Sequence, residues 1–180
     1  MMLEYVFKII IVGDSGVGKT TAIKRFIEGG FVSDTKATIG MNFSFKQLFL
    51  NLNDSNNNPV RISLHIWDTG GEQRFRDILR FNMKGTKGLI IAFDGTSLIT
   101  FESLSQWLEL IKLYIDFNSI PAILISTKYD LKTEINTNLL KPFLRKYNIS
   151  EYYPTSAVTG KNIKSVFKKL CRLMINKTSL

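Results

Sequence analysis

The sequence predicts an α/β domain built on a six-stranded, mostly parallel sheet, with one antiparallel hairpin at its edge and helices on both faces. Apolar, β-branched runs alternate along the chain with segments of helical periodicity, as in a parallel sheet covered by helices. Two runs of alternating apolar and polar residues flank one asparagine-rich turn, which is typical of an antiparallel hairpin. The chain has 180 residues and no recognisable linker or repeat, so we expect a single domain over residues 1–180.

The hydrophobic pattern predicts each element in turn. We expect strands at 5–12, 41–52, 60–67, 88–94, 121–126 and 152–155, and helices at 18–28, 100–118, 137–148 and 161–175. Gly29 and Gly30 end the first helix, as glycine commonly does. Pro142 fits a helix over 137–148 only in its first turn, where amide groups lack partners in any case. Residues 53–59 form the turn of the hairpin, and residues 68–84 form a loop with a helix in its second half.

Composition and charge limit the classes of function. Hydrophobic residues make up 44% of the chain and charged residues 22%, as in an ordinary globular protein. No apolar run reaches the ~18 residues of a membrane span, and we see no signal peptide. The single cysteine, Cys171, excludes an internal disulfide and fits a reducing compartment, so we expect a cytoplasmic protein. The net charge of +9 favours anionic partners, but no basic run interleaved with aromatics indicates nucleic-acid binding.

The stretch from Gly13 to Thr20 fits the phosphate-binding pattern G-x-x-x-x-G-K-[ST] at every fixed position. A buried strand runs into it and a helix follows it, which is the context that this motif requires. Backbone N–H groups at glycines and at the helix start can approach a polyphosphate. Lys19 would reach the β- and γ-phosphates, and the Thr20 hydroxyl would ligate Mg²⁺. The expected phosphate ligands are Asp14, Ser15, Gly16, Val17, Gly18, Lys19, Thr20 and Thr21.

A second motif, Asp68-x-x-Gly71, follows the strand at 60–67. A carboxylate at a strand end beside the phosphate loop can hold Mg²⁺ through its water shell. Gly71 can turn its backbone N–H onto a γ-phosphate because no side chain blocks the approach. This pattern is common by itself, and its position behind a phosphate loop makes it specific.

These stretches resemble the small GTPases of the Ras superfamily, and they are most similar to its Rab branch. The similarity lies in residues 37–43, 67–71, 74–76 and 101–107, and it extends over nearly the whole chain. It implies the Ras-like P-loop NTPase fold, GTP, GDP and Mg²⁺ as ligands, and a molecular switch that hydrolyses GTP slowly. By this resemblance, Thr38 ligates Mg²⁺ and senses the γ-phosphate.

The resemblance also places Phe31 against the guanine, although an aromatic anchor between this loop and the core would look the same in the sequence. Thr127-Lys128-Tyr129-Asp130 resembles the family's Asn-Lys-x-Asp, with Thr127 in the place of asparagine. A buried Asp130 would accept two hydrogen bonds from guanine and would reject adenine, while the Lys128 stem covers the base. The shorter Thr127 would lose a bond either to the base or to the phosphate loop.

Ser156-Ala157-Val158 resembles the family's Ser-Ala-Lys, with Val158 in place of the lysine. The resemblance makes the Ala157 N–H a donor to guanine O6 and places Ser156 and Val158 beside the nucleotide. Taken alone, the stretch is equally consistent with an ordinary turn between a strand and a helix.

Hydrolysis depends on residues that depart from the family. Glu72 takes the place of the glutamine that orients the attacking water, and Gln73 follows it. A carboxylate cannot donate to the γ-phosphate, and it repels developing negative charge. We therefore assign catalysis to Glu72, Gln73 and Lys19 and expect a slow rate. Two alternatives stay open: a GTP-binding scaffold without hydrolysis, and a P-loop ATPase or kinase, against which Asp130 argues.

The resemblance further implies effectors, an exchange factor and a GTPase-activating protein that bind at residues 31–43 and 68–84. Phe43 and Trp67 belong to the family's exposed aromatic cluster, whereas Asn82 occupies its third position. We therefore expect an effector surface unlike that of a standard Rab. The last residues contain neither a cysteine pair nor a C-a-a-X box, so we expect no lipidation. We expect a monomer, with at most a weak peripheral attraction of the basic last helix to acidic membranes.

Overall fold

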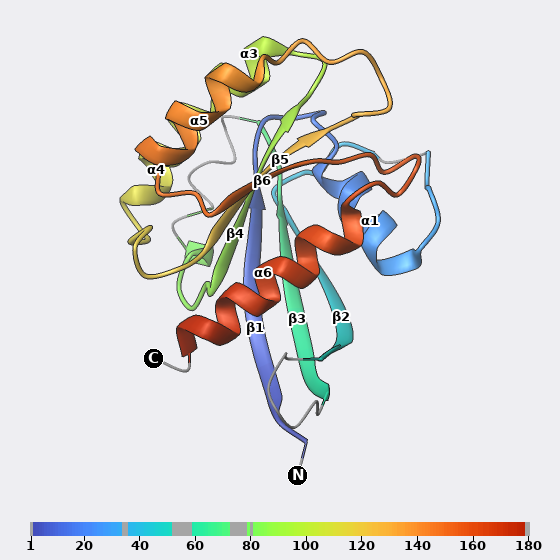
Figure 1. Ribbon diagram of the computed structural model, residues 1–180, viewed down its shortest axis with the longest axis vertical. Helices are drawn as coiled ribbons and strands as arrows, with labels where there is room; N and C mark the ends of the chain where they lie inside the picture. The colour runs from blue at the N-terminus through green and yellow to red at the C-terminus, as the bar shows by residue number, and fades with distance from the viewer. Residues whose placement is uncertain (1, 34–35, 52–58, 73–78, 80, 179–180) are drawn as a thin grey trace.

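The computed structural model describes residues 2–33, 36–51, 59–72, 79 and 81–178. In this part of the chain the sheet consists of β1 (Glu4–Val12), β2 (Met41–Asn51), β3 (Pro59–Thr69), β4 (Gly88–Asp94), β5 (Ala122–Thr127) and β6 (Glu151–Pro154). Their order is β2-β3-β1-β4-β5-β6, and only the β2–β3 pair is antiparallel (Figure 1). The predicted fold class is confirmed. The turn expected at 53–59 lies, apart from Pro59, outside the described residues.

Helices cover both faces of this sheet (Figure 1). The helices α1 (Lys19–Glu28) and α6 (Ile163–Thr178) pack on one face, and α3 (Leu98–Glu102), α4 (Leu104–Lys112) and α5 (Thr137–Lys146) pack on the other. Successive side chains of β1 point to opposite faces. Ile9 and Ile11 therefore join the core beneath α1 and α6, whereas Ile10 and Val12 join the core beneath α3, α4 and α5. No helix in the described residues is both long and apolar enough to cross a bilayer.

The carboxyl ends of the parallel strands meet at one edge of the sheet, where ligands bind in open α/β folds. In the strand register Ile11 of β1 lies opposite Asp68 of β3, and Asp94 of β4 lies opposite Thr127 of β5. The carboxyl ends of β1, β3, β4 and β5 thus bring the residues of the predicted motifs to the same edge of the sheet.

The prediction of one helix over 100–118 is wrong in its bounds. The structure has two helices, α3 and α4, separated at Ser103, and α4 ends at Lys112. The apolar stripe that motivated the prediction is buried, but Ser103 turns its hydroxyl toward Asp14 of the phosphate loop. Beyond Lys112 the backbone tightens, because the Leu113 N–H donates to the Leu110 carbonyl, a bond of the 3₁₀ type.

The expectation for Pro142 is also wrong. Pro142 is the sixth residue of α5, beyond the first turn, and the helix ends at Lys146. The Asn136 side chain caps the helix by accepting from the Asn138 N–H at 2.9 Å. Pro142 and Asn138 are both exposed, so water reaches the Asn138 carbonyl that a proline cannot pair. Exposure explains how the helix tolerates this residue.

Candidate nucleotide-binding site

The phosphate loop joins β1 to α1 at the centre of the sheet edge. Gly13 has a φ of +143°, a conformation that favours glycine. A Cβ on Gly13 would lie 2.0 Å from the Ala92 carbonyl oxygen, so this position also has no room for a side chain. The close packing of the loop on β4 fixes where the chain turns toward α1.

Lys19 lies across this loop and is only 5% exposed. Its Nζ donates to the carbonyl oxygens of Gly13 and Asp14, both at 2.7 Å. Burial lowers the pKa of Lys19 to about 8, although the carboxylates of Asp68 and Asp14 act to raise it. A buried cation of this kind gains most from an anion placed beside it.

Asp68, Thr20 and Thr38 form a cluster of oxygen atoms next to Lys19. The two threonine hydroxyls lie 2.8 Å apart, and the Thr20 hydroxyl donates to Asp68 Oδ2 at 2.5 Å. Asp68 is 2% exposed, and its Oδ1 has no hydrogen-bond partner among the described residues. Burial raises the pKa of Asp68, against the hydrogen bond from Thr20 and the charge of Lys19.

This cluster fits a magnesium ion. A buried carboxylate oxygen without a partner is costly, and hard cations such as Mg²⁺ prefer oxygen ligands. The described residues contain no group of three or more His, Cys, Asp or Glu side chains that could hold a metal alone. One carboxylate and two hydroxyl groups suit an ion that completes its coordination with phosphate oxygens and water, as Mg²⁺ does in phosphoryl-transfer sites.

The segment after β3 contacts the phosphate loop directly. A Cβ on Gly71 would lie 2.0 Å from the Ser15 nitrogen and 2.1 Å from the Asp14 carbonyl carbon. The Gly70 N–H donates to the Gly40 carbonyl at 2.7 Å, which joins this segment to the loop that carries Thr38. The two segments expected to sense the γ-phosphate thus meet above the phosphate loop.

Two adjoining cavities occupy this edge of the sheet. One, of ≈ 330 Å³, lies over the phosphate loop, and the other, of ≈ 230 Å³, lies beside the end of β5. Gly18, Thr21 and Lys128 line both, so the two form one continuous site. The first cavity is lined by Ser15, Gly16, Gly18, Lys19, Thr20, Thr21, Lys36, Ala37, Thr38, Thr69, Gly71 and Lys128. The second is lined by Gly18, Thr21, Ala22, Phe31, Ser33, Thr127, Lys128, Asp130, Leu131, Thr155, Ala157 and Val158.

Asp130 lines the second cavity but is exposed, so the expectation of a buried carboxylate is wrong. It lies three residues beyond the end of β5. Its Oδ1 accepts a hydrogen bond from the buried Ser156 hydroxyl at 2.5 Å. This bond fixes the position of one carboxylate oxygen. Ser156 therefore contacts Asp130 and does not line the cavity itself.

Thr127 keeps a bond to the phosphate loop. Its buried hydroxyl contacts the Val17 carbonyl and lies 3.1 Å from the Phe93 carbonyl, and one hydroxyl hydrogen serves both acceptors. We expected a threonine at this position to lose a hydrogen bond either to the base or to the phosphate loop. The structure excludes the second loss, because Thr127 is bonded to the phosphate loop.

Asp94 is a residue that the sequence reasoning missed. Its Oδ2 lies 2.6 Å from the Lys128 Nζ, and Lys128 has a φ of +56°. Burial would raise the pKa of Asp94, but hydrogen bonds from Lys128 and Thr96 hold it below its usual value. The sequence shows that Asp94 ends a buried strand, but it does not show that this strand lies beside the one that ends in Thr127.

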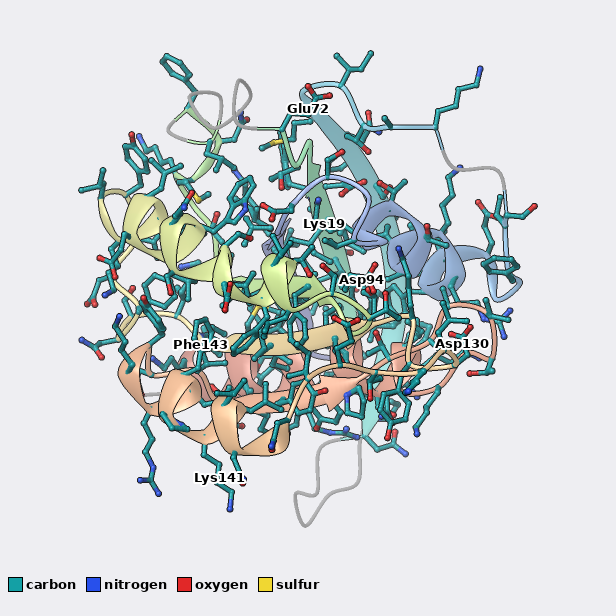
Figure 2. All side chains as sticks on the ribbon, turned by 90° about the horizontal axis from the view of Figure 1, so that it is seen from above. Lys19, Glu72, Asp94, Asp130, Lys141 and Phe143 are labelled. Carbon is teal, nitrogen blue, oxygen red and sulfur yellow. The ribbon has the colours of Figure 1, made fainter. Side chains whose placement is uncertain are left out.

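The remaining expected residues divide into three groups. Phe31, Ala157 and Val158 line the second cavity as expected, and Ser33 and Lys36 line the cavities without having been predicted. Val17 is buried in the core and the Asp14 side chain contacts α4, and neither residue lines the two cavities. Glu72 is half-buried, and in Figure 2 Lys19 lies between Glu72 and Asp130. Gln73 lies outside the described residues.

Comparison with known proteins finds that this chain is similar to proteins of the Ras family. The family model described as the Ras family matches residues 8–176. The Ras-related protein RABA4b of Arabidopsis thaliana is 34% identical over 97% of this chain and 75% of its own length. The human Ras-related protein Rab-4B is 33% identical over 97% of this chain and 78% of its own. The GTP-binding protein ypt4 of Schizosaccharomyces pombe is 30% identical over 98% and 75%.

Proposed function

Because the chain belongs to the Ras family of small GTPases, we propose that it binds GDP and GTP with Mg²⁺ and hydrolyses GTP slowly. The observation that carries the proposal is the single continuous site, with a buried cation at one end and a carboxylate at the other. Lys19 and the backbone N–H groups of the phosphate loop match a polyphosphate. Asp130 matches the paired N–H donors of guanine.

In this proposal each group has a distinct role. Thr20 and Thr38 would ligate Mg²⁺, and Asp68 would hold it through water; the ion would neutralise charge on the phosphates. The Lys19 ammonium would bind the β- and γ-phosphates and stabilise their negative charge. Loss of the γ-phosphate would release the segments of Thr38 and Gly71, which is how such switches change state.

The proposal includes protein partners at residues 31–43 and 68–84. Phe43 is 54% exposed, and its ring packs edge-on against Trp67 at 5.6 Å. Ile39 and Phe81 are also exposed. An apolar surface of this kind, beside segments that respond to the nucleotide, is suited to effectors and regulators.

The binding step is tested by Lys19→Ala, with the exposed Lys141→Ala on α5 as a matched control. Figure 2 shows Lys141 pointing away from Lys19. Loss of the buried ammonium should weaken GDP binding by about 100-fold or more in titration calorimetry with Mg²⁺. The control should bind like the wild type. An unchanged affinity of Lys19→Ala would remove Lys19 from the site.

A second candidate, a GTP-binding scaffold without hydrolysis, is favoured by Glu72 in the place of the family's glutamine. Single-turnover phosphate release from GTP separates the two functions. We expect slow release by the wild type and a rate about tenfold or more lower in Glu72→Ala or Gln73→Ala, with GDP affinity unchanged. If neither variant alters the rate, the catalytic assignment fails. If the wild type releases no phosphate, the scaffold is the correct function.

A further inference from the structure

The phosphate loop is tied to α4 through the side chain of Asp14. The Trp107 Nε1–H donates to Asp14 Oδ1 at 2.7 Å, and the Ser103 hydroxyl donates to Asp14 Oδ2. Trp107 is 0% exposed, and it is among the largest fully buried side chains of the described residues. The carboxylate thus receives two side-chain donors, one from α4 and one from the residue that caps it, about 90 positions later in the chain.

The local structure of α3 and α4 aims both donors at the same point. Ser103 lies where the two helices separate, and its backbone keeps helical angles, with φ −63° and ψ −20°. Trp107 follows four residues later, so the two side chains lie on one face. The irregularity at Ser103 therefore coincides with its contact to Asp14.

Asp14 in turn contacts the parts of the site that handle phosphate. Its carbonyl accepts from the Lys19 Nζ at 2.7 Å, and its carbonyl carbon is packed against the Cα of Gly71. Its carboxylate is absent from the lining of the phosphate-side cavity, which keeps its negative charge from facing an anionic ligand. A shift of Asp14 would move the carbonyl that holds Lys19 and the surface on which Gly71 rests.

We propose that Ser103 and Trp107 are positioning residues, which hold Asp14 and thereby keep the phosphate loop in its nucleotide-binding conformation. The inference rests on the proposed function, because the property that it controls is the retention of GDP. It differs from a packing role for α4, which would stabilise the fold without acting through the Asp14 carboxylate.

The test measures GDP dissociation in the presence of Mg²⁺ for Ser103→Ala and Trp107→Phe, with Ser105→Ala on the same helix as the control. Each of the first two variants removes one hydrogen bond to a carboxylate, and dissociation should become roughly tenfold faster. The control should stay within about twofold of the wild type. If Trp107→Phe does not fold, the Ser103→Ala variant still tests the inference, because the Ser103 side chain is small and half-buried.

Two further variants separate positioning from packing. In an Asp14→Ala background, Ser103→Ala should cause no additional acceleration, because its partner is gone. Asp14→Asn keeps an acceptor for Trp107 and a partner for Ser103, and it should restore dissociation to within about threefold of the wild type. Unchanged rates in the single variants, or an equal effect of Ser103→Ala in both backgrounds, would overturn the inference. Failure of the wild type to bind GDP would instead overturn the proposed function, and this inference with it.

Discussion

At the level of single residues, the burial of Lys19 determines how the site responds to pH. Burial lowers the pKa of Lys19 to about 8, and a bound phosphate would raise it again. The attraction of Lys19 for phosphate is therefore complete well below pH 8 and declines as the pH rises through about 8, because Lys19 of the free protein then loses its proton.

Binding of GDP should consequently take up protons. We expect roughly half a proton more per GDP at pH 8.5 than at pH 7.5, since a group with a pKa of about 8 passes through about half of its titration between these values. Calorimetry in two buffers of different ionisation enthalpy measures this uptake. Equal uptake at the two pH values would show that Lys19 does not titrate on binding.

The residues that the sequence identified are those fixed by local motifs. Gly13, Lys19 and Asp68 could be found because spacing alone places a loop or a strand end beside them. Asp94 and the bond from Thr127 to Val17 could not, because both depend on which strands are neighbours. The exposure of Asp130 depends on the loop beyond β5, which no periodicity predicts.

At the level of elements, α5 is destabilised by a proline in its interior, Pro142. Pro142 cannot donate to the carbonyl of Asn138, and an interior proline typically costs about 3 kcal/mol in a helix. Its neighbour Phe143 points inward, with its ring 5.0 Å from that of Phe101, so α5 is held to the core by packing. Figure 2 shows Phe143 and the outward-pointing Lys141 on opposite sides of the helix.

Pro142→Ala should therefore raise the free energy of unfolding, by about 1–2 kcal/mol after allowance for the greater freedom of the unfolded chain. Chemical denaturation measures the change, and Lys141→Ala at the adjacent exposed position should stay within about 0.5 kcal/mol of the wild type. A less stable Pro142→Ala protein would show that the proline contributes to α5.

The division between α3 and α4 shows why element boundaries were harder to predict than elements. The apolar stripe of Phe101, Leu104, Leu108 and Ile111 continues through Ser103, so periodicity gives one helix. What distinguishes Ser103 is its contact with Asp14, which is distant in the sequence. The strands were easier, because burial on both faces leaves unbroken apolar runs in β4 and β5.

At the level of the whole molecule, the sheet order converts scattered motifs into one site. Placing β1 between β3 and β4 brings Asp68, the phosphate loop and Asp94 to the same edge, and β5 adds Thr127 and Asp130. The alternation of strands and helices predicted a parallel sheet, but it did not give this order. The proposed function therefore requires one continuous site, with phosphates bound at Lys19 and guanine bound at Asp130.

The most direct test is competition for the site in the presence of Mg²⁺. We expect unlabelled GDP to displace a fluorescent GDP at least about 1,000-fold more effectively than ADP does, because adenine does not offer the Asp130 carboxylate the pair of N–H donors that guanine does. Asp130→Asn should shift the preference from GDP toward xanthosine diphosphate. Equal displacement by ADP and GDP, or no binding of the labelled nucleotide at all, would contradict the account.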